Sequence, residues 1–394
     1  MTHMQISSSL SVVTGDLDSV IDTAPLKPFS DEVIAFLDDL SKLLMAEKGF
    51  SDIVSLGFWI RRASMMKEKA KYDDINVRLG RGIAFHIAPS NVAVNFAFSL
   101  VMGLLSGNAN IVRLPSNEFA QTGIITCAIS KLLSSKHKSL SPYICLVKYP
   151  VSKDISDKLS RICDVRVIWG GDRTVKELRL SPLKPRASDI AFADRYSIAI
   201  INADAYLADV NKEGIAKDFY NDTYYNDQNA CSAPSAVFWM GTNIDEARPV
   251  FWDHIRKMAQ ERYPLSAVQL VGKLSALYRA AVNIDCLPVE VNDNYLTCIE
   301  IKGIDENLTD YRYHSGFFFE CRINKLSEIL PICNDKLQTL VYYGVESDEI
   351  EAFLFSSRPR GIDRVVPMGK SMDFSLIWDG HDIIREMSRR VVFV

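Results

Sequence analysis

The sequence predicts an α/β fold, and three observations support this class. Apolar, strand-like segments alternate with helical segments between residues 82 and 169. Each connection is long enough for a crossover helix, which is the pattern of a parallel sheet. The chain has 394 residues, too many for one ordinary core, so two domains are expected. Parallel sheets of this kind bind nucleotides at the carboxyl ends of their strands.

The first part of the chain is expected to be helical before this alternation begins. A capping segment at residues 30–32 precedes a periodic helix over residues 33–44, and a second helix is expected over residues 53–71. Gly107 is expected to cap the C-terminal end of a later, apolar helix. The alternating part comprises strands over residues 82–88, 110–114, 143–147 and 165–169, with helices over residues 92–105, 119–133 and 155–162.

The chain is expected to divide into three parts. Residues 1–195 form the helical N-terminus and the nucleotide-binding domain, and residues 196–365 form a catalytic α/β domain that contains Cys231. Residues 366–394 form a C-terminal tail that is apolar enough to pack against a neighbouring subunit, so a homo-oligomer is expected.

Composition and charge narrow the classes of function. Hydrophobic residues (48%) and charged residues (24%) occur in the proportions of a soluble globular protein. A net charge of −4 without a basic block argues against binding to nucleic acid or to a membrane surface. The most apolar helix, residues 92–105, is shorter than the roughly 20 residues that span a bilayer. The N-terminus lacks the pattern of a secretory signal, so a cytoplasmic location is expected.

Among the eight cysteines, Cys231 has an unusual setting. No C-x-x-C pair or histidine cluster is present, so free thiols and no metal site are expected. Cys231 follows a polar segment, residues 226–230 (NDQNA), and precedes an apolar strand, residues 236–240. A cysteine among small and amide residues at the mouth of a strand is placed for nucleophilic attack as a thiolate. The alternative is a buried structural cysteine.

Three further segments follow expected strands and are placed to converge. Asn91 follows the first strand, where its amide can donate to a developing oxyanion or cap the next helix. Arg113 and Ser116 close the second strand, where they suit ribose or phosphate binding or form a solvated strand end. Gly170 and Gly171 open a helix and allow close approach of a phosphate. No G-x-G-x-x-G is present, so the usual dinucleotide fingerprint is absent.

Taken in order, these segments resemble the aldehyde dehydrogenase superfamily and, within it, the LuxC-type acyl-CoA reductase family. The likeness extends over about residues 50–394, and several motifs in the right order make it specific. The matching segments are residues 82–92 (GIAFHIAPSNV), 105–108 (LSGN), 169–172 (WGGD), 227–234 (DQNACSAP), 363–369 (DRVVPMG) and 378–380 (WDG).

The resemblance implies a fold and a set of roles. The fold is that of aldehyde dehydrogenases, with a nucleotide-binding parallel-sheet domain and an α/β catalytic domain. Cys231 would be the nucleophile that accepts the acyl group, and Asn91 with the backbone N–H of Cys231 would form the oxyanion hole. Arg113 stands where the superfamily usually has a lysine near the adenosine ribose. Gly170 and Gly171 would lie beside the cofactor.

Three positions bear on the chemistry and the cofactor that the resemblance implies. Phe192 falls where hydrolytic members have a glutamate that activates water, so transfer to or from a thiol is favoured over hydrolysis. Ser116 falls near the carboxylate that often holds the ribose hydroxyls of NAD. Because serine tolerates a 2′-phosphate better, NADPH is the expected cofactor, with NADH as the alternative. Glu320 is a candidate for the superfamily's ribose-binding glutamate.

The expected function is NADPH-dependent reduction of a fatty acyl thioester to the aldehyde through an acyl group on Cys231. The expected donor is acyl-CoA or an acyl-protein, with an acyl-protein synthetase as a partner. Two alternatives stay open: reduction of a small acyl-CoA or acyl phosphate, and acyl transfer by Cys231 without reduction. A non-catalytic acyl carrier that serves a synthetase is a further alternative.

Overall fold

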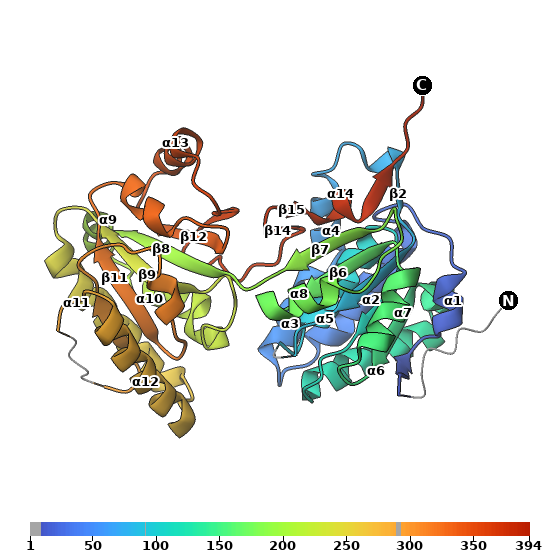
Figure 1. The fold of residues 1–394 in the computed structure, drawn as a ribbon, viewed down its shortest axis with the longest axis horizontal. Coiled ribbons are helices and arrows are strands. Elements are labelled where there is room, and N and C mark those ends of the chain that lie inside the picture. Colours follow the sequence, from blue (N-terminus) through green and yellow to red (C-terminus); the bar gives the residue numbers. More distant parts are fainter. Residues whose placement is uncertain (1–8, 91, 289–292) are drawn as a thin grey trace. The chain divides into compact units, whose positions relative to one another are not determined.

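The computed structural model describes residues 9–90, 92–288 and 293–394 (Figure 1). The chain divides into two compact units. Unit 1 comprises Met1–Ala193 and Phe374–Val394, and unit 2 comprises Asp194–Asp373. The segment 366–394, expected as a tail, is therefore shared between the units, and the C-terminus belongs to unit 1 (Figure 1).

A six-stranded sheet forms the centre of unit 1, in the order β1-β5-β4-β3-β6-β7. The strands are β1 Ser11–Thr14, β3 Ile83–Ile87, β4 Ala109–Arg113, β5 Ile144–Lys148, β6 Val165–Trp169 and β7 Ser188–Phe192. All neighbours are parallel except β1, which is antiparallel to β5. The four predicted strands are confirmed as β3 to β6, because buried parallel strands appear as continuous apolar runs. Sheet growth reverses direction at β3, which is where such sheets bind ligands.

Helices cover both faces of this sheet. They are α1 Leu17–Ile21, α2 Asp31–Met45, α3 Ser51–Trp59, α4 Arg62–Lys69, α5 Asn95–Leu105, α6 Ala120–Ser134, α7 Lys153–Ile162, α8 Asp172–Arg179 and α14 Ile383–Glu386, with 3₁₀ turns at Ile75–Val77 and Lys138–Tyr143. Apolar residues of α2, α3, α5 and α6 form the core on one face, and those of α1, α7 and α8 form the core on the other.

The C-cap expected at Gly107 is confirmed. Gly107 has a φ of 85°, and its N–H donates to the carbonyl of Leu104 (2.9 Å). The N–H of Asn108 donates to the carbonyl of Gly103 (3.0 Å). These two bonds define a Schellman motif, whose left-handed residue is usually glycine.

One of two expectations about the helical N-terminus is confirmed, and the other is wrong. Ser30 is the N-cap residue of α2, as expected, although its hydroxyl makes no capping bond. The helix expected over residues 53–71 breaks at Arg61, which has an extended backbone, and it restarts as α4. The restart is capped from a distant part of the chain, because the N–H of Arg62 donates to Oδ1 of Asp38 on α2 (3.1 Å).

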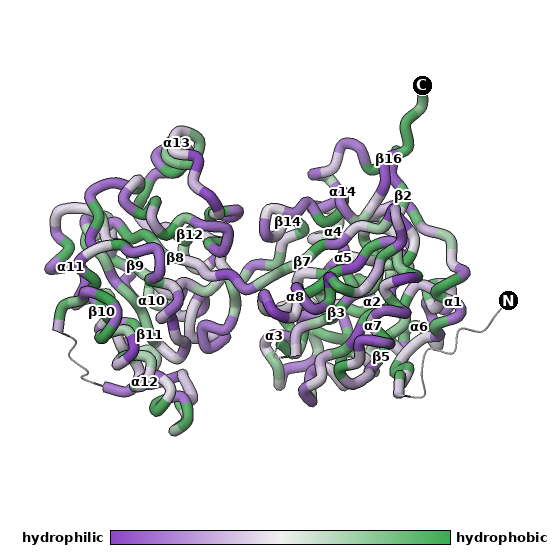
Figure 2. Tube along the Cα trace, viewed as in Figure 1, coloured by the Kyte–Doolittle hydropathy of each residue, from purple (hydrophilic) through white to green (hydrophobic). Residues whose placement is uncertain are grey.

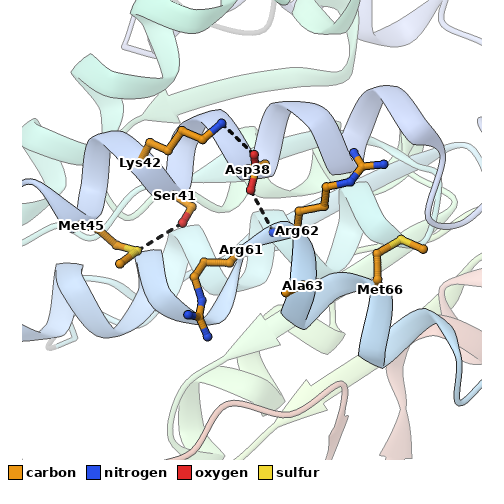
Figure 3. A pocket seen from close by; sticks show the side chains of 8 residues that line it. All are labelled: Asp38, Ser41, Lys42, Met45, Arg61, Arg62, Ala63 and Met66. Atoms are coloured by element: carbon orange, nitrogen blue, oxygen red, sulfur yellow. Dashed lines mark hydrogen bonds and ion pairs between the residues drawn. The ribbon is translucent and has the colours of Figure 1, made fainter.

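The break opens a surface groove between α2 and the start of α4 (Figure 3). Two of its polar side chains are already paired: Asp38 binds Lys42 (2.8 Å), and the hydroxyl of Ser41 donates to the carbonyl of Gly57 (2.6 Å). None of the residues singled out in the sequence lines it. The lining residues are Asp38, Ser41, Lys42, Met45, Arg61, Arg62, Ala63 and Met66.

A buried chain of hydrogen bonds joins β3, β4 and β6 to α5. His86 Nδ1 lies 2.7 Å from Ser99 Oγ, and His86 Nε2 lies 3.0 Å from Asn110 Oδ1. Trp169 Nε1 also donates to Ser99 Oγ (3.0 Å). Because Asn110 Oδ1 only accepts, Nε2 carries the proton and Nδ1 accepts from the serine. Burial lowers the pKa of His86 to about 4, so the ring is neutral at neutral pH.

Residues 374–394 complete unit 1. The hairpin of β14 (Ile377–Trp378) and β15 (His381–Asp382) precedes α14. The last strand, β16 (Ser388–Arg390), pairs antiparallel with β2 (Arg78–Gly80). The final residues, 392–394, are apolar and exposed (Figure 2). Across the described parts of the chain, every helix is too short or too polar to cross a bilayer.

A second six-stranded sheet forms the centre of unit 2, in the order β10-β11-β9-β8-β12-β13, with all neighbours parallel. The strands are β8 Tyr196–Asn202, β9 Pro234–Met240, β10 Thr297–Glu300, β11 Phe317–Arg322, β12 Leu337–Tyr343 and β13 Arg364–Pro367. The helices are α9 Ala203–Ala208, α10 Lys212–Asp222, α11 Ile244–Arg262, α12 Ala267–Asn283 and α13 Ser347–Ser357, with 3₁₀ turns at Tyr224–Asn226, Leu308–Tyr311 and Leu326–Ile332. α10 and α11 cover one face, and α12 and α13 the other.

Two β-bulges interrupt this sheet at the edge where its strands begin. Leu337 and Thr339 of β12 pair with consecutive residues of β8, which leaves Gln338 as an extra residue. A second bulge leaves Ser235 as the extra residue of β9. Bulges redirect side chains and are common beside active sites.

Candidate active site

The loop before β9 carries Cys231 and contains two consecutive left-handed residues. Asp227 and Gln228 both have a φ of 51°. This conformation costs a residue other than glycine roughly 1–2 kcal/mol, so it persists only where contacts hold it. Both side chains supply such contacts.

Gln228 bridges the starts of β9 and β11. Its Oε1 accepts from the N–H groups of Gly316 (2.7 Å) and Phe317 (3.2 Å). Its Nε2 donates to the carbonyls of Phe317 (3.2 Å) and Pro234 (3.3 Å). These four bonds fix the path of the chain just before Cys231.

Asp227 ties the same loop to the segment before β11. Its carboxylate binds His314 Nδ1 (3.1 Å), Ser315 Oγ (2.8 Å), Gln269 Nε2 (2.9 Å) and the hydroxyl of Tyr263. Burial alone would raise the pKa of Asp227, but these hydrogen bonds outweigh it and lower the pKa to about 2. The carboxylate is therefore ionised at neutral pH and acts as an anchor.

Cys231 itself is half-buried at the edge where the strands of the second sheet begin. Its Sγ accepts a hydrogen bond from Nε2 of Gln338 on β12 (3.2 Å). Its carbonyl accepts from Ser197 Oγ on β8 (2.7 Å). The thiol therefore has a directed donor, and its backbone is fixed to the neighbouring strand.

Arg364 supplies a positive charge near this cysteine. It begins β13, and its guanidinium donates to the carbonyls of Ser371 (2.6 Å) and Asp373 (2.9 Å). Burial lowers the pKa of Arg364. Negative charge on Asp373, Asp222 or Cys231 acts against that shift. A thiolate at Cys231 and the Arg364 cation thus stabilise each other.

Asp222, at the end of α10, holds the loop after β13. Its carboxylate accepts from the N–H groups of Gly369 (2.6 Å) and Ser371 (3.0 Å). Burial raises the pKa of Asp222 to about 6. Ser232 Oγ donates to the sulfur of Met372 (3.6 Å), so this loop also contacts the residue that follows the cysteine.

In unit 1, four of the expected cofactor-binding residues lie at one edge of the sheet. Arg113 ends β4, and Ser116 lies exposed in the bend that follows. Gly170 and Gly171 follow β6, and Gly171 is the N-cap of α8. Because β4 and β6 flank β3 and run parallel to it, all four residues share the carboxyl edge of the sheet.

This edge has features that suit an anionic ligand. Nη2 of Arg113 donates to the carbonyl of Tyr149 (3.4 Å), while its Nε is buried without a hydrogen-bond partner. A Cβ added at Gly171 would meet no atom within 4 Å, so the start of α8 is open. An unpaired buried donor and an open helix N-terminus are both satisfied by a phosphate.

Two further residues, Phe192 and Asn91, are expected at the reaction site. Phe192 ends β7 and stacks on Trp169, with ring centroids 3.8 Å apart. The expected correspondence of Phe192 to the glutamate of hydrolytic members rests on the resemblance and stays a prediction. Asn91, expected in the oxyanion hole, lies outside the described residues, and its role stays a prediction.

Glu320 lies on β11 in unit 2 and is buried. Its carboxylate accepts from Nε1 of Trp239 (2.9 Å), Nε1 of Trp252 (2.7 Å) and the guanidinium of Arg248 (3.0 Å). A carboxylate with this set of donors stabilises the packing of α11 on the sheet. These contacts give no support to its expected role in ribose binding, which stays a prediction.

Comparison with protein families identifies the group to which the chain belongs. The family model described as acyl-CoA reductase (LuxC) matches residues 21–276, which is more than half of the chain. The chain belongs to the acyl-CoA reductase (LuxC) family. It is therefore an enzyme of the aldehyde-forming acyl reductase class, as the motifs predicted.

Curated relatives of this LuxC-family chain carry the name long-chain acyl-protein thioester reductase. The protein of Photorhabdus laumondii is 21% identical over 371 residues, covering 90% of this chain and 72% of the relative. The protein of Aliivibrio fischeri is 23% identical over 386 residues, covering 93% of this chain and 74% of the relative.

Solved structures similar to this LuxC-family chain are aldehyde dehydrogenases. An NAD-dependent benzaldehyde dehydrogenase of Corynebacterium glutamicum has a TM-score of 0.65 at 11% identity, covering 97% of this chain and 94% of that one. A 1-pyrroline-5-carboxylate dehydrogenase of Thermus thermophilus has a TM-score of 0.63 at 13% identity, covering 96% and 84%. The aldehyde dehydrogenase-like fold predicted from the sequence is confirmed.

Sequence reasoning missed two residues beside Cys231 in this LuxC-family chain. Gln338 is a buried amide in an otherwise largely apolar strand, which is a recognisable signal, but its direction depends on a bulge that the sequence does not show. Arg364 belongs to the segment DRVVPMG, which carried part of the resemblance without a role assigned to it.

Proposed function

We propose that this enzyme reduces a long-chain fatty acyl thioester to the aldehyde with NADPH, through an acyl group held on Cys231. The observation that carries the proposal is the hydrogen bond from Gln338 to Sγ of the half-buried Cys231. A partly accessible cysteine with a donor and a cation nearby is suited to act as a thiolate nucleophile. The names of the curated relatives support a long-chain thioester as substrate.

Arg113, Ser116, Gly170 and Gly171 are the residues proposed to hold the cofactor. The unpaired buried Nε of Arg113 and the open start of α8 fit an anionic dinucleotide. Ser116 favours NADPH over NADH, because a serine does not repel the 2′-phosphate as a carboxylate would. When bound, NADPH supplies the hydride for reduction.

The first proposed step is acyl transfer to Cys231. The thiolate attacks the thioester carbonyl, a bond forms from Sγ to the carbonyl carbon, and the bond to the leaving thiol breaks. The leaving thiolate takes up a proton. By resemblance to the superfamily, Asn91 and the backbone N–H of Cys231 donate to the oxyanion, and one such donor is worth roughly 10²–10³ in rate.

In the second step the acyl group on Cys231 becomes a thiohemiacetal. Hydride addition places negative charge on the carbonyl oxygen, which the same donors stabilise. The oxygen then re-forms the carbonyl, the bond to Sγ breaks, and the aldehyde leaves with the thiolate restored. Phe192 offers no base to activate water, so reduction is expected to outpace hydrolysis of the acyl-enzyme.

The acyl donor is proposed to be acyl-CoA or an acylated protein. An acyl-protein synthetase is the proposed partner that supplies such an acylated protein. The exposed apolar residues 392–394 support the proposal of a homo-oligomer. A cytoplasmic location completes the proposal.

The test is a nucleotide-oxidation assay with acyl-CoA substrates of increasing chain length, run with NADPH and with NADH. Long chains and NADPH are expected to give the highest kcat/KM. Cys231→Ala is expected to abolish reduction while NADPH binding, measured by fluorescence titration, stays nearly unchanged. Activity in Cys231→Ala would overturn the covalent mechanism, and a preference for short chains or acyl phosphates would overturn the substrate class.

A further inference from the structure

We propose that Gln338 is a second catalytic residue of this enzyme, which donates a hydrogen bond to the Cys231 thiolate and holds its sulfur in one orientation for attack. This inference rests on the proposed function, because it assigns a role at the same nucleophile. It adds a residue from a strand more than a hundred positions away in the sequence.

The bulge in β12 is the feature that brings Gln338 to the sulfur. Side chains alternate between the two faces of a regular strand, and an extra residue locally changes that alternation. Gln338 is the extra residue, and its Nε2 lies 3.2 Å from Sγ of Cys231. Only 1% of Gln338 is exposed, so water does not compete for this bond.

Thr339 fixes the direction of the Gln338 amide. Its Oγ1 donates to Oε1 of Gln338 (3.2 Å), and the residue is fully buried. The amide oxygen is thereby turned to the hydroxyl, and the NH₂ group is turned to the sulfur. Because an amide does not titrate, Gln338 stays a donor to the thiolate over the whole working range of pH.

The Arg364 cation acts in the same direction as this hydrogen bond, and two neighbouring carboxylates partly offset the cation. Arg364 on β13 supplies the cation, Asp222 on α10 and Asp373 after β13 balance that cation, and Ser197 on β8 contacts the carbonyl of Cys231. A neutral donor in contact with the sulfur and a cation near it both favour the thiolate over the thiol. Arg364 also holds the loop after β13, so its substitution would change the structure as well as the charge. Gln338 is therefore the better residue to substitute.

A purely structural role for Gln338 predicts a different outcome. In that case its substitution would lower the melting temperature and leave the reactivity of Cys231 in the folded chain unchanged. The two roles are separated by the pH profile of thiol alkylation, which reports the thiolate fraction without any substrate or cofactor.

The experiment uses the full chain and measures the alkylation rate of Cys231 by iodoacetamide from about pH 5 to about pH 10, with the labelled peptide quantified by mass spectrometry. Gln338→Met keeps the length of the side chain and removes both donors. We expect the midpoint of the profile to move upward by about one unit, with an about tenfold lower rate at neutral pH. Thr339→Val, which frees the amide to turn, should give a smaller upward shift. Gln121→Leu in unit 1 is the matched control and should give none, because that glutamine contacts Asp52.

An unchanged midpoint in folded Gln338→Met would overturn the inference, while thioester reduction by the native enzyme would leave the proposed function standing. If the midpoint shifts in Gln338→Met but the native enzyme reduces no thioester, the inference about Gln338 stands and the proposed function is overturned. If Gln338→Met does not fold, Thr339→Val decides, and an unshifted profile in that variant overturns the inference.

Discussion

Cys231 owes its setting to residues that are distant in the sequence. Its own loop supplies position, through the four hydrogen bonds of Gln228. Its hydrogen-bond donor, Gln338, and the neighbouring cation, Arg364, lie at the starts of two other strands. The sequence singled out the cysteine because its polar neighbours are local, whereas the donor and the cation meet it only through the order of strands in the sheet.

At the scale of single residues, Asn91→Ala is expected to lower turnover by roughly 10²–10³, as for loss of one oxyanion donor. Loss of a simple helix cap would instead cost only about 1 kcal/mol of stability. Turnover per folded molecule, with the folded fraction measured by thermal unfolding, separates the two roles. Unchanged turnover with a marked drop in melting temperature would contradict an oxyanion role.

At the scale of elements, the fold was most predictable where strands are buried on both faces. β6 has the predicted bounds, because its other four residues are apolar and buried even though the strand contains Arg166. The break between α3 and α4 was missed because its cap comes from Asp38 on another helix. The bulge at Gln338 was missed for the same reason, since it depends on the register against β8.

The packing of α5 on the first sheet gives a prediction at this scale. A Cβ added at Gly103 would lie 1.8 Å from Oδ1 of Asn110, which accepts from His86. Gly103→Ala should therefore break this bond and cost about 2–3 kcal/mol of unfolding free energy. Gly123→Ala on α6 is the control, because nothing lies within 4 Å there, and it should stabilise by about 0.5–1 kcal/mol. If Gly103→Ala and Gly123→Ala change the unfolding free energy equally in urea, the clash of the added methyl group with Asn110 does not affect stability.

For the whole molecule, the buried His86 predicts how stability depends on pH. Its pKa is about 4 in the folded chain and near 6.5 when unfolded, so the unfolded chain binds more protons between these values. The contribution of neutral His86 is thus complete above pH 6.5 and falls by about 3 kcal/mol as the pH drops toward 4. Asp222, with a pKa raised to about 6, acts in the opposite direction, since its contribution is lost as the pH rises through 6.

In the His86→Gln variant the glutamine does not titrate. Asp222 contributes equally to the variant and to the native chain. As the pH falls from 6.5 toward 4, the unfolding free energy of the variant should therefore decrease less than that of the native chain. This holds whatever the stability of the variant at neutral pH. Urea unfolding at steps across the window measures the difference. Identical slopes would mean that His86 is not buried as a neutral ring.

The motifs along the chain predicted the family by resemblance, and the alternation of strands and helices predicted the class of fold. Arg113 and Gly171 do lie at one carboxyl edge of the first sheet. Glu320 accepts from Trp239 and Trp252 within unit 2, and its role in ribose binding stays a prediction.

The central claim is that Cys231 carries the acyl group and that no base stands ready to hydrolyse it. The direct measurement is the intact mass of the enzyme after mixing with a long-chain acyl-CoA without NADPH. Because general-base help is worth roughly 10²–10⁴ in rate and Phe192 cannot give it, an acyl adduct on Cys231 should persist until NADPH or free coenzyme A is added. Rapid release of free fatty acid, with no adduct detected at any time, would contradict the account.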